Sequence, residues 1–391
     1  MSDTINYLKK QLKENIQTYA ILLAMVFVWI LFSFLTKGKY VGSQNFSNLF
    51  RQMTVTSFLA VGMVLVIVTG GIDLSVGRLA GFVSVVVAKF QDDIWFNLLP
   101  NDPLLTTILS VLIGIAVGTI FELIQGYFIA YLRVPSFIVT LGGMWILNGA
   151  ILVVTEGKTI AANQPIFSYI AQGYLPQNVG WIAAGVVILI LFLTMFRNRR
   201  NKVKYGFAVT PLAIDIAKSV LLSVLIGVYV FIVNKYNGVQ FPVLLLAITA
   251  VTMSYISTNT PIGRYAYAIG GNREAARLSG VNIKNTVFKV FLMMGLLCGV
   301  SGVVLASYVG YGTIAAGTGY ELDAIASCIL GGTSTLGGIG TIFGAIIGAL
   351  IMASLTSGLQ MLNVPAAWQY ILKGLVLVLA VYADVYMKKN Q

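Results

Sequence analysis

Residues 270–280 are Gly270-Gly271-Asn272-Arg273-Glu274-Ala275-Ala276-Arg277-Leu278-Ser279-Gly280, a polar and basic stretch with apolar runs on both sides. The Glu-Ala-Ala triplet and Leu278 favour a helix, and Gly280 can end that helix in a left-handed cap. A short helix held outside the bilayer between two membrane spans suits docking to a soluble partner. The alternative is a surface loop that happens to be helical, because such triplets are common.

The composition places the chain in a membrane. Hydrophobic residues make up 58% and charged residues 10% of it, and the mean hydropathy is +0.88, whereas about a quarter of a soluble domain is charged. The apolar runs are continuous rather than alternating, which predicts an all-α polytopic membrane protein and disfavours a β-barrel. The net charge of +12 lies in loops, which indicates membrane orientation rather than nucleic-acid binding. Histidine is absent, and Cys298 and Cys328 lie in apolar segments, so neither a metal site nor a disulfide framework is expected.

About twelve spans are predicted, because a helix of about 20 apolar residues crosses a bilayer. Their approximate limits are residues 18–35, 54–69, 76–90, 104–131, 136–155, 180–197, 212–233, 241–257, 286–309, 320–335, 338–356 and 365–385. An even number of spans puts both ends on one side, and the basic loops place that side in the cytoplasm. These inside loops hold Arg78, Arg133, the basic cluster at 197–204 and the cations between Arg264 and Lys284.

A faint repeat relates the two halves. Tyr131-Leu132-Arg133-Val134-Pro135 matches Met361-Leu362-Asn363-Val364-Pro365, each just before a helix. The match maps a first repeat at 54–155 onto a second at 286–385 with opposite orientation, an inverted repeat; the alternative is chance recurrence of a short turn. Residues 1–391 are then one transmembrane domain with a ten-span core. An inserted helix pair with a basic loop occupies 198–257, and a cytoplasmic loop with the docking helix occupies 258–285.

Two glycine-rich stretches interrupt the apolar sequence, at residues 69–77 and 331–338. Non-helical backbone at membrane depth must be buried in protein or line a water-filled cavity, so both are predicted at the inner end of a translocation path. The alternative is close helix packing by glycine. The candidate path or gate residues are Gly70, Gly71, Asp73, Ser75, Gly77, Gly331, Gly332, Thr333 and Ser334. Asp73 is either a functional intramembrane carboxylate or, the favoured interpretation, a cap for the next helix.

Several polar and aromatic side chains lie within predicted spans. A transported sugar needs hydroxyl-pairing groups and flat apolar faces, whereas the alternative role of such residues is hydrogen bonding between helices. The candidate lining residues are Glu122, Gln125, Trp145, Asn148, Trp368 and Gln369.

Three motifs together resemble one known family. They are Gly-Gly-Ile-Asp-Leu-Ser-x-Gly at 70–77, the segment from Ile269 to Asn282, and Glu321-Leu322-Asp323-Ala324-Ile325-Ala326. They are similar to the permease subunits of ATP-binding-cassette (ABC) importers for monosaccharides of the ribose, xylose and galactose type, and the long form with the inserted pair most resembles the xylose type. The resemblance implies a type II-like permease that translocates xylose or a related pentose or hexose.

The resemblance also implies partners and a location. The permease would be a homodimer in the lipid of a bacterial cytoplasmic (inner) membrane, served by two ABC ATPase subunits and an external sugar-binding protein. Coupling to the ATPase would fall to Asn272, Arg273, Glu274, Ala275, Ala276, Arg277, Leu278 and Gly280. ATP and Mg would belong to the ATPase, because this chain has no phosphate-binding G-x-x-x-x-G-K-[ST] motif. The chain by itself is therefore expected to be non-enzymatic and to hold no cofactor.

Two other functions stay open on the sequence. One is an ABC permease for nucleosides, branched-chain amino acids or another small polar solute. The other is a secondary transporter driven by an ion gradient, which also uses inverted repeats and broken helices. Intramembrane carboxylates are few beyond Asp73 and Glu122, and the docking helix has no role in a secondary transporter.

Overall fold

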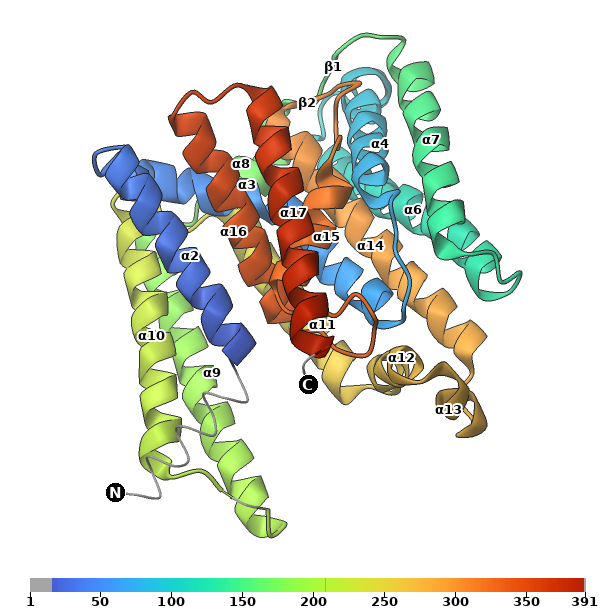
Figure 1. Ribbon diagram of the computed structural model, residues 1–391. Helices are drawn as coiled ribbons and strands as arrows, with labels where there is room; N and C mark the ends of the chain where they lie inside the picture. Colours follow the sequence, from blue (N-terminus) through green and yellow to red (C-terminus); the bar gives the residue numbers. More distant parts are fainter. Residues whose placement is uncertain (1–15, 208, 390–391) are drawn as a thin grey trace.

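The computed structural model describes residues 16–207 and 209–389 (Figure 1), which form helices joined by short connections. The long helices of the first half are α2 (Ile16–Leu35), α3 (Ser43–Val68), α4 (Val76–Lys89), α6 (Pro103–Ala130), α7 (Ser136–Thr155) and α9 (Gln177–Lys204). The second half holds α10 (Leu212–Asn234), α11 (Phe241–Asn259), α12 (Pro261–Gly271), α13 (Arg273–Leu278), α14 (Ile283–Val309), α15 (Tyr320–Leu330), α16 (Ile342–Met361) and α17 (Ala366–Lys389). Strands β1 (Ile160–Ala161) and β2 (Tyr311–Gly312) pair antiparallel.

Eight helices in the described part are long and apolar enough to cross a membrane, namely α3, α6, α7, α9, α10, α11, α14 and α16. The all-α polytopic prediction is therefore confirmed. Helices α4, with 14 residues, and α15, with 11, are shorter than the about 20 residues that a crossing needs. Several limits differ from prediction: α3 begins at Ser43, well before residue 54, the expected span 320–335 ends as a helix at Leu330, and α9 continues through the basic cluster to Lys204, where a loop was expected after residue 197.

Helices α3 and α14 form the centre of the molecule. Their apolar windows are 83% and 78% buried, against 11% for α9. Helix α14 packs against α6, α4 and α3, while α3 also packs against α16 and α15. Glycines allow α6 and α14 to touch through their backbones: a Cβ on Gly118 would lie only 2.7 Å from the Gly295 oxygen. Small residues at helix contacts permit this approach in membrane proteins.

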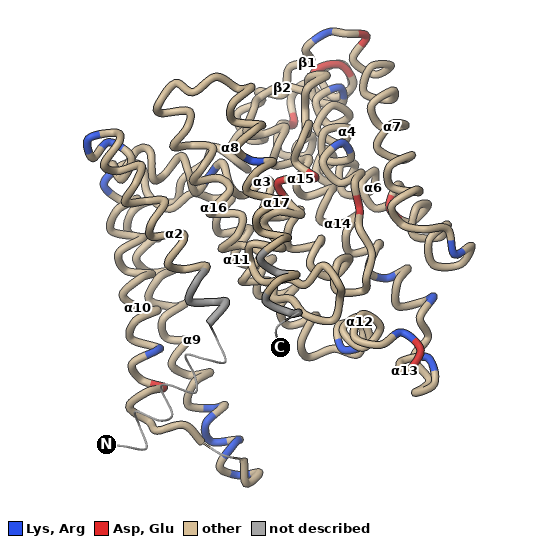
Figure 2. The backbone as a smooth tube through the Cα atoms, in the orientation of Figure 1, with Lys and Arg blue, Asp and Glu red and all other residues tan. Residues whose placement is uncertain are grey.

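Helices α12 and α13 lie at one end of the molecule, called here the α13 end, and β1 and β2 lie at the opposite end, called the β end (Figure 1). The basic cluster 197–204 on α9 and the cations of α12 and α13 gather at the α13 end (Figure 2). Helices α9 and α10 pack on each other beside the centre, and α10 also packs against α3.

The turn before α7 and the turn before α17 share an unusual backbone. Arg133 has φ +59° and Asn363 has φ +55°, and both are the third residue of the matched five-residue stretches. A left-handed conformation is uncommon for residues other than glycine. The first of these turns lies toward the α13 end and the second toward the β end (Figure 1).

Arg78 does not lie in an inside loop, so that part of the charge assignment is wrong. It belongs to α4 and is 6% exposed. Its guanidinium donates to the Ala316 oxygen at 2.9 Å, to Thr318 Oγ1 at 2.7 Å and to the Ile314 oxygen at 3.1 Å. These three acceptors permit burial of a cation that would otherwise be placed in water.

Candidate functional site

Helix α13 is defined by caps at both ends. At its start, Asn272 Oδ1 accepts from the Ala275 N–H at 2.9 Å. At its end, Gly280 has φ +83°, and the Val281 N–H donates to the Ala276 oxygen at 3.0 Å. This 6→1 bond around a left-handed glycine is the Schellman pattern. The predicted helix and its glycine cap are therefore confirmed.

The outer surface of α13 is charged and accessible. Arg277 Nε donates to Glu274 Oε2 at 3.1 Å, and both side chains are exposed, as is Leu278. Ala276 is buried beneath them. Beside α13 lies a hollow of about 790 Å³ whose lining carries four cations, Arg133, Arg273, Arg277 and Lys284, with Glu274 as the acidic member. This end of the molecule presents a largely basic surface around an exposed leucine.

Helix α12 lies between α13 and two other parts of the molecule, the end of α3 just before the first glycine-rich stretch and the second glycine-rich stretch. The first break is residues 69–75, between α3 and α4, and the second break is residues 331–341, between α15 and α16. The Gly338 N–H donates to the Val68 oxygen at 2.9 Å, so the second break is tied to the last residue of α3. Gly270 of α12 lies against this bond: a Cβ there would overlap the Val68 oxygen and lie 2.9 Å from its carbonyl carbon.

A tyrosine adds a second link between α12 and the second break. Tyr267 donates its hydroxyl to the Gly340 oxygen at 2.7 Å. Burial raises the pKa of this hydroxyl, which keeps it protonated as a donor. Helix α12 therefore contacts the second break and the end of α3 at the same time. Sequence reasoning missed Tyr267, whose only signal was a tyrosine just before the docking segment.

Two hydroxyl groups of α7 hydrogen-bond the backbone of the first break. Gly70 has φ +82° and ends α3. The Ile72 N–H then donates to Ser136 Oγ at 3.2 Å, and the Leu74 N–H donates to Thr140 Oγ1 at 3.1 Å. These bonds give partners to two backbone N–H groups that would bond within the chain if the segment were helical. Within a bilayer such groups need a protein partner. Neither α7 residue was among the predicted site residues.

Four predicted residues meet beside the first break. Asp73 Oδ1 accepts from the Ser75 N–H at 2.8 Å and from Ser75 Oγ at 2.7 Å. Gln125 Nε2 donates to Ser75 Oγ at 2.8 Å and to Glu122 Oε1 at 3.2 Å. All four are buried, so this polar cluster ties the start of α4 to α6. Asp73 thus orders the backbone just before α4, and Glu122 and Gln125 bond between helices within this cluster.

Three acceptor oxygens of the polar cluster lack a hydrogen-bond donor. Asp73 Oδ2, Glu122 Oε2 and Gln125 Oε1 are buried and accept no hydrogen bond within the described residues. Burying a polar atom without a hydrogen bond is costly. The Asp73 and Glu122 carboxyls lie within hydrogen-bonding reach of each other, so one shared proton would pair their oxygens and lower this cost.

The second break bends through glycines. Gly332, Gly337 and Gly338 have φ of +85°, +88° and +73°. Gly331 packs on α16, where a Cβ would lie 2.6 Å from the Ala345 nitrogen. Thr333 and Ser334 are buried inside the turn.

The two breaks are not equivalent in position. Gly77 lies inside α4 and packs on the connection before α15, where a Cβ would be 2.7 Å from the Gly317 oxygen. Gly338 ends the second glycine-rich stretch of the sequence as Gly77 ends the first, but it lies instead against α12 and the end of α3. Gly70 and Gly71 follow α3, whereas Gly331 and Gly332 follow α15. The position of Gly77 therefore agrees with the alternative that this glycine permits close packing of a helix.

The remaining lining candidates lie apart from the polar cluster. Trp145 and Asn148 are on α7, and Trp368 and Gln369 are on α17. Both tryptophans are exposed on the surface of the single chain. Gln369 instead lines a cavity with residues of α15 and α16.

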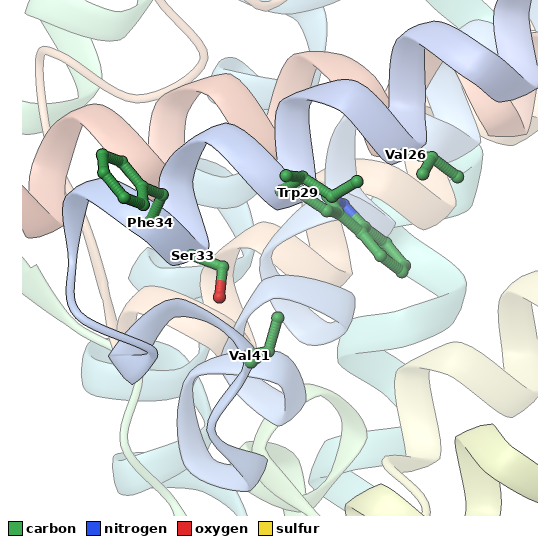
Figure 3. Close-up of a pocket in the computed structure, with 6 residues that line it drawn as sticks. Val26, Trp29, Ser33, Phe34 and Val41 are labelled. Atoms are coloured by element: carbon green, nitrogen blue, oxygen red, sulfur yellow. The ribbon is translucent and has the colours of Figure 1, made fainter.

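A different hollow, of about 490 Å³, lies along α2 (Figure 3). Its lining residues are Val26, Trp29, Ile30, Ser33, Phe34 and Val41. All but Ser33 are apolar or aromatic, and Trp29 uses its indole N–H on Ser354 Oγ at 2.9 Å. Such a surface suits lipid chains and has little to pair with a hydrophilic solute.

Comparisons with known proteins agree with this architecture. A protein-family model described as "Branched-chain amino acid transport system / permease component" matches residues 45–381. The chain is 41% identical over 376 residues to the xylose transport system permease protein XylH of Haemophilus influenzae, covering 96% of this chain and 98% of that protein. It is 39% identical to XylH of Escherichia coli, covering 96% and 93%, and 33% identical to that bacterium's ribose import permease protein RbsC, covering 87% and 85%. No solved structure matches the chain significantly. The chain is therefore a multi-pass membrane protein that belongs to this family of transport-system permease components.

Proposed function

We propose that this chain is the membrane-spanning permease subunit of an ATP-driven ABC importer for a monosaccharide, with xylose or a related pentose or hexose as the solute. The substrate class is drawn from the xylose and ribose permeases that resemble it over most of their length. The observation that carries the mechanism is the packing of α12 on the end of α3, where the first break begins, and on the second break, through Gly270 against Val68 and Tyr267 against Gly340.

The proposed topology has about twelve spans, with both ends of the chain and α13 in the cytoplasm of a bacterium. Its support is the gathering of arginine and lysine at the α13 end (Figure 2). In this topology α13 faces the ATPase, and the β end faces the external sugar-binding protein. The ATPase and not this chain would bind ATP and Mg.

We also propose that α3, α4, α6 and α7 form one repeat and that α14, α15, α16 and α17 form its inverted counterpart. The packing of the helices supports this correspondence. Helix α14 packs on α6 and α4, and its counterpart α3 packs on α16 and α15. In the same way, α7 packs on α4 and its counterpart α17 packs on α15. The left-handed turns at Arg133 and Asn363 occupy matching places and point to opposite ends. Inverted repeats of this kind surround many transport pathways. Helices α10 and α11 would be the inserted pair.

In the proposed mechanism, closure of the ATPase moves α13, and α12 passes the movement to both breaks. The ATPase must bind the outward-open and inward-open states with different affinity, because equal binding shifts nothing. Two copies of the chain would enclose the path, each contributing α7 and α17, whose apolar surfaces are exposed in the single chain.

The test is uptake by vesicles that contain the chain, its ATPase and its sugar-binding protein. Radiolabelled D-xylose should accumulate only with ATP inside, and competition by unlabelled ribose, galactose, a nucleoside or leucine should rank the solutes. Accumulation driven by a proton or sodium gradient without ATP would refute the proposal in favour of a secondary transporter. Strong competition by the nucleoside or leucine alone would refute the sugar assignment.

A further inference from the structure

A second cavity, of about 460 Å³, lies between α15, α16 and α17. Its members on α16, Thr356 and Gln360, belong to the last turns of that helix, and Gln369 and Tyr370 belong to the first turns of α17. Gln52 of α3 closes one side. The cavity therefore opens in the half of the molecule nearer the β end, where a solute from outside would arrive.

An ion pair spans the cavity wall. Lys373 Nζ of α17 lies 2.8 Å from Asp323 Oδ2 of α15, and the two side chains are only 21% and 13% exposed. Buried charges are expensive, and in membrane proteins they often mark a solute pathway. Lysine carries three N–H donors and aspartate about four acceptor positions, so this pair has capacity left for hydroxyl groups.

The rest of the lining combines polar and aromatic side chains with the apolar residues Leu322, Ala326, Met352, Ala366 and Leu377. Within the described residues, the side chains of Gln52, Gln360 and Tyr370 make no hydrogen bond, although each can donate and accept. Tyr320 and Tyr370 add flat ring faces to the same wall. The volume falls in the range of about 300–1,000 Å³ that is usual for small-molecule sites. Its size and its mixture of hydroxyl-pairing groups with aromatic rings fit one monosaccharide.

We infer that this cavity is a monosaccharide subsite of the import path, in which Asp323 and Lys373 bind sugar hydroxyls and Tyr320 and Tyr370 cover the ring. The inference rests on the proposed function and adds a place and a set of contacts to it. Of the residues predicted from sequence to line the path, Gln369 belongs to this subsite, whereas Glu122 and Gln125 do not.

Cysteine protection tests the subsite directly. The native Cys298 and Cys328 are both buried, so their background reaction with a water-borne thiol reagent is expected to be small. Gln360→Cys and Tyr370→Cys are expressed singly in the full chain, and their labelling by a membrane-impermeant methanethiosulfonate is timed with and without D-xylose. Xylose should slow labelling at both positions several-fold, and sucrose should not. Asn101→Cys, on an exposed connection, is the control and should label equally with and without sugar.

Transport by ion-pair variants gives the second measurement. Lys373→Gln and Asp323→Asn should lower xylose uptake about tenfold while the loaded binding protein still stimulates ATP hydrolysis. Two results would refute the subsite without affecting the proposed importer function. One is normal ATP-driven uptake by the wild type together with no protection of either introduced cysteine by xylose. The other is unchanged uptake in both ion-pair variants. Protection without ATP-driven uptake would keep the subsite and reject the importer.

Discussion

Replacing Gly270 by alanine perturbs the contact of α12 with the end of α3 and with the second break. The added Cβ would overlap the Val68 oxygen and lie 2.9 Å from the Val68 carbon, and both are backbone atoms that no rotamer change can move. Either α12 moves away or the 2.9 Å bond between the Gly338 N–H and the Val68 oxygen breaks. Overpacking costs about 1–3 kcal/mol, and a lost hydrogen bond adds about 1 kcal/mol.

This cost should appear as lost coupling. A bias of about 1–3 kcal/mol between two conformations corresponds to a roughly 5–150-fold change in their ratio. We therefore expect Gly270→Ala to lower the sugar imported per ATP hydrolysed by about tenfold or more, while the permease still binds its ATPase. The assay measures uptake and phosphate release in the same vesicles.

Gly271→Ala is the matched control. A Cβ on Gly271 meets no atom within 4 Å, and its φ is not in the left-handed region. This variant should transport like the wild type. If the Gly270→Ala and Gly271→Ala variants imported the same amount of sugar per ATP hydrolysed, the proposed transmission through α12 would be refuted. Thermal unfolding of both purified variants separates a coupling defect from a folding defect.

Three further predictions concern the docking helix and the buried polar groups. The double variant Glu274→Ala/Arg277→Ala should keep its thermal midpoint, because both side chains are exposed, but should lose co-purification of the ATPase; retention of the ATPase would contradict docking there. Gly280→Ala forces a left-handed residue at a cost of about 1–2 kcal/mol, and should weaken ATPase binding measured by titration; unchanged binding would count against the capped helix. Glu122→Leu removes one acceptor of Gln125 Nε2, which keeps its bond to Ser75 Oγ, and should destabilise the protein by about 1–3 kcal/mol, whereas Glu122→Gln should be milder; equal thermal midpoints would contradict the polar cluster.

Features set by neighbouring residues could be predicted from the sequence. The apolar runs marked the long helices, and Asn272 and Gly280 marked the two ends of α13 because caps act within one turn. Arg133 and Asn363 were found as a matched pair, although their shared left-handed backbone is not written in the residue types.

Contacts between distant segments could not be predicted. Glu122 and Gln125 were chosen as lining residues, yet both bond to Ser75 because α6 crosses the start of α4. Arg78 was counted as a loop cation because a charge count ignores acceptors supplied from residues 314–318. The Asp323–Lys373 pair joins two helices 50 positions apart and leaves no local pattern.

The central claim is that ATP hydrolysed by a separate subunit drives solute through this chain. The most direct measurement is D-xylose accumulation in vesicles holding the permease, the ATPase and the binding protein, with an ionophore present to collapse ion gradients. The account predicts uphill accumulation that needs ATP and is unaffected by the ionophore. Accumulation by the permease alone, abolished by the ionophore and indifferent to ATP, would contradict it.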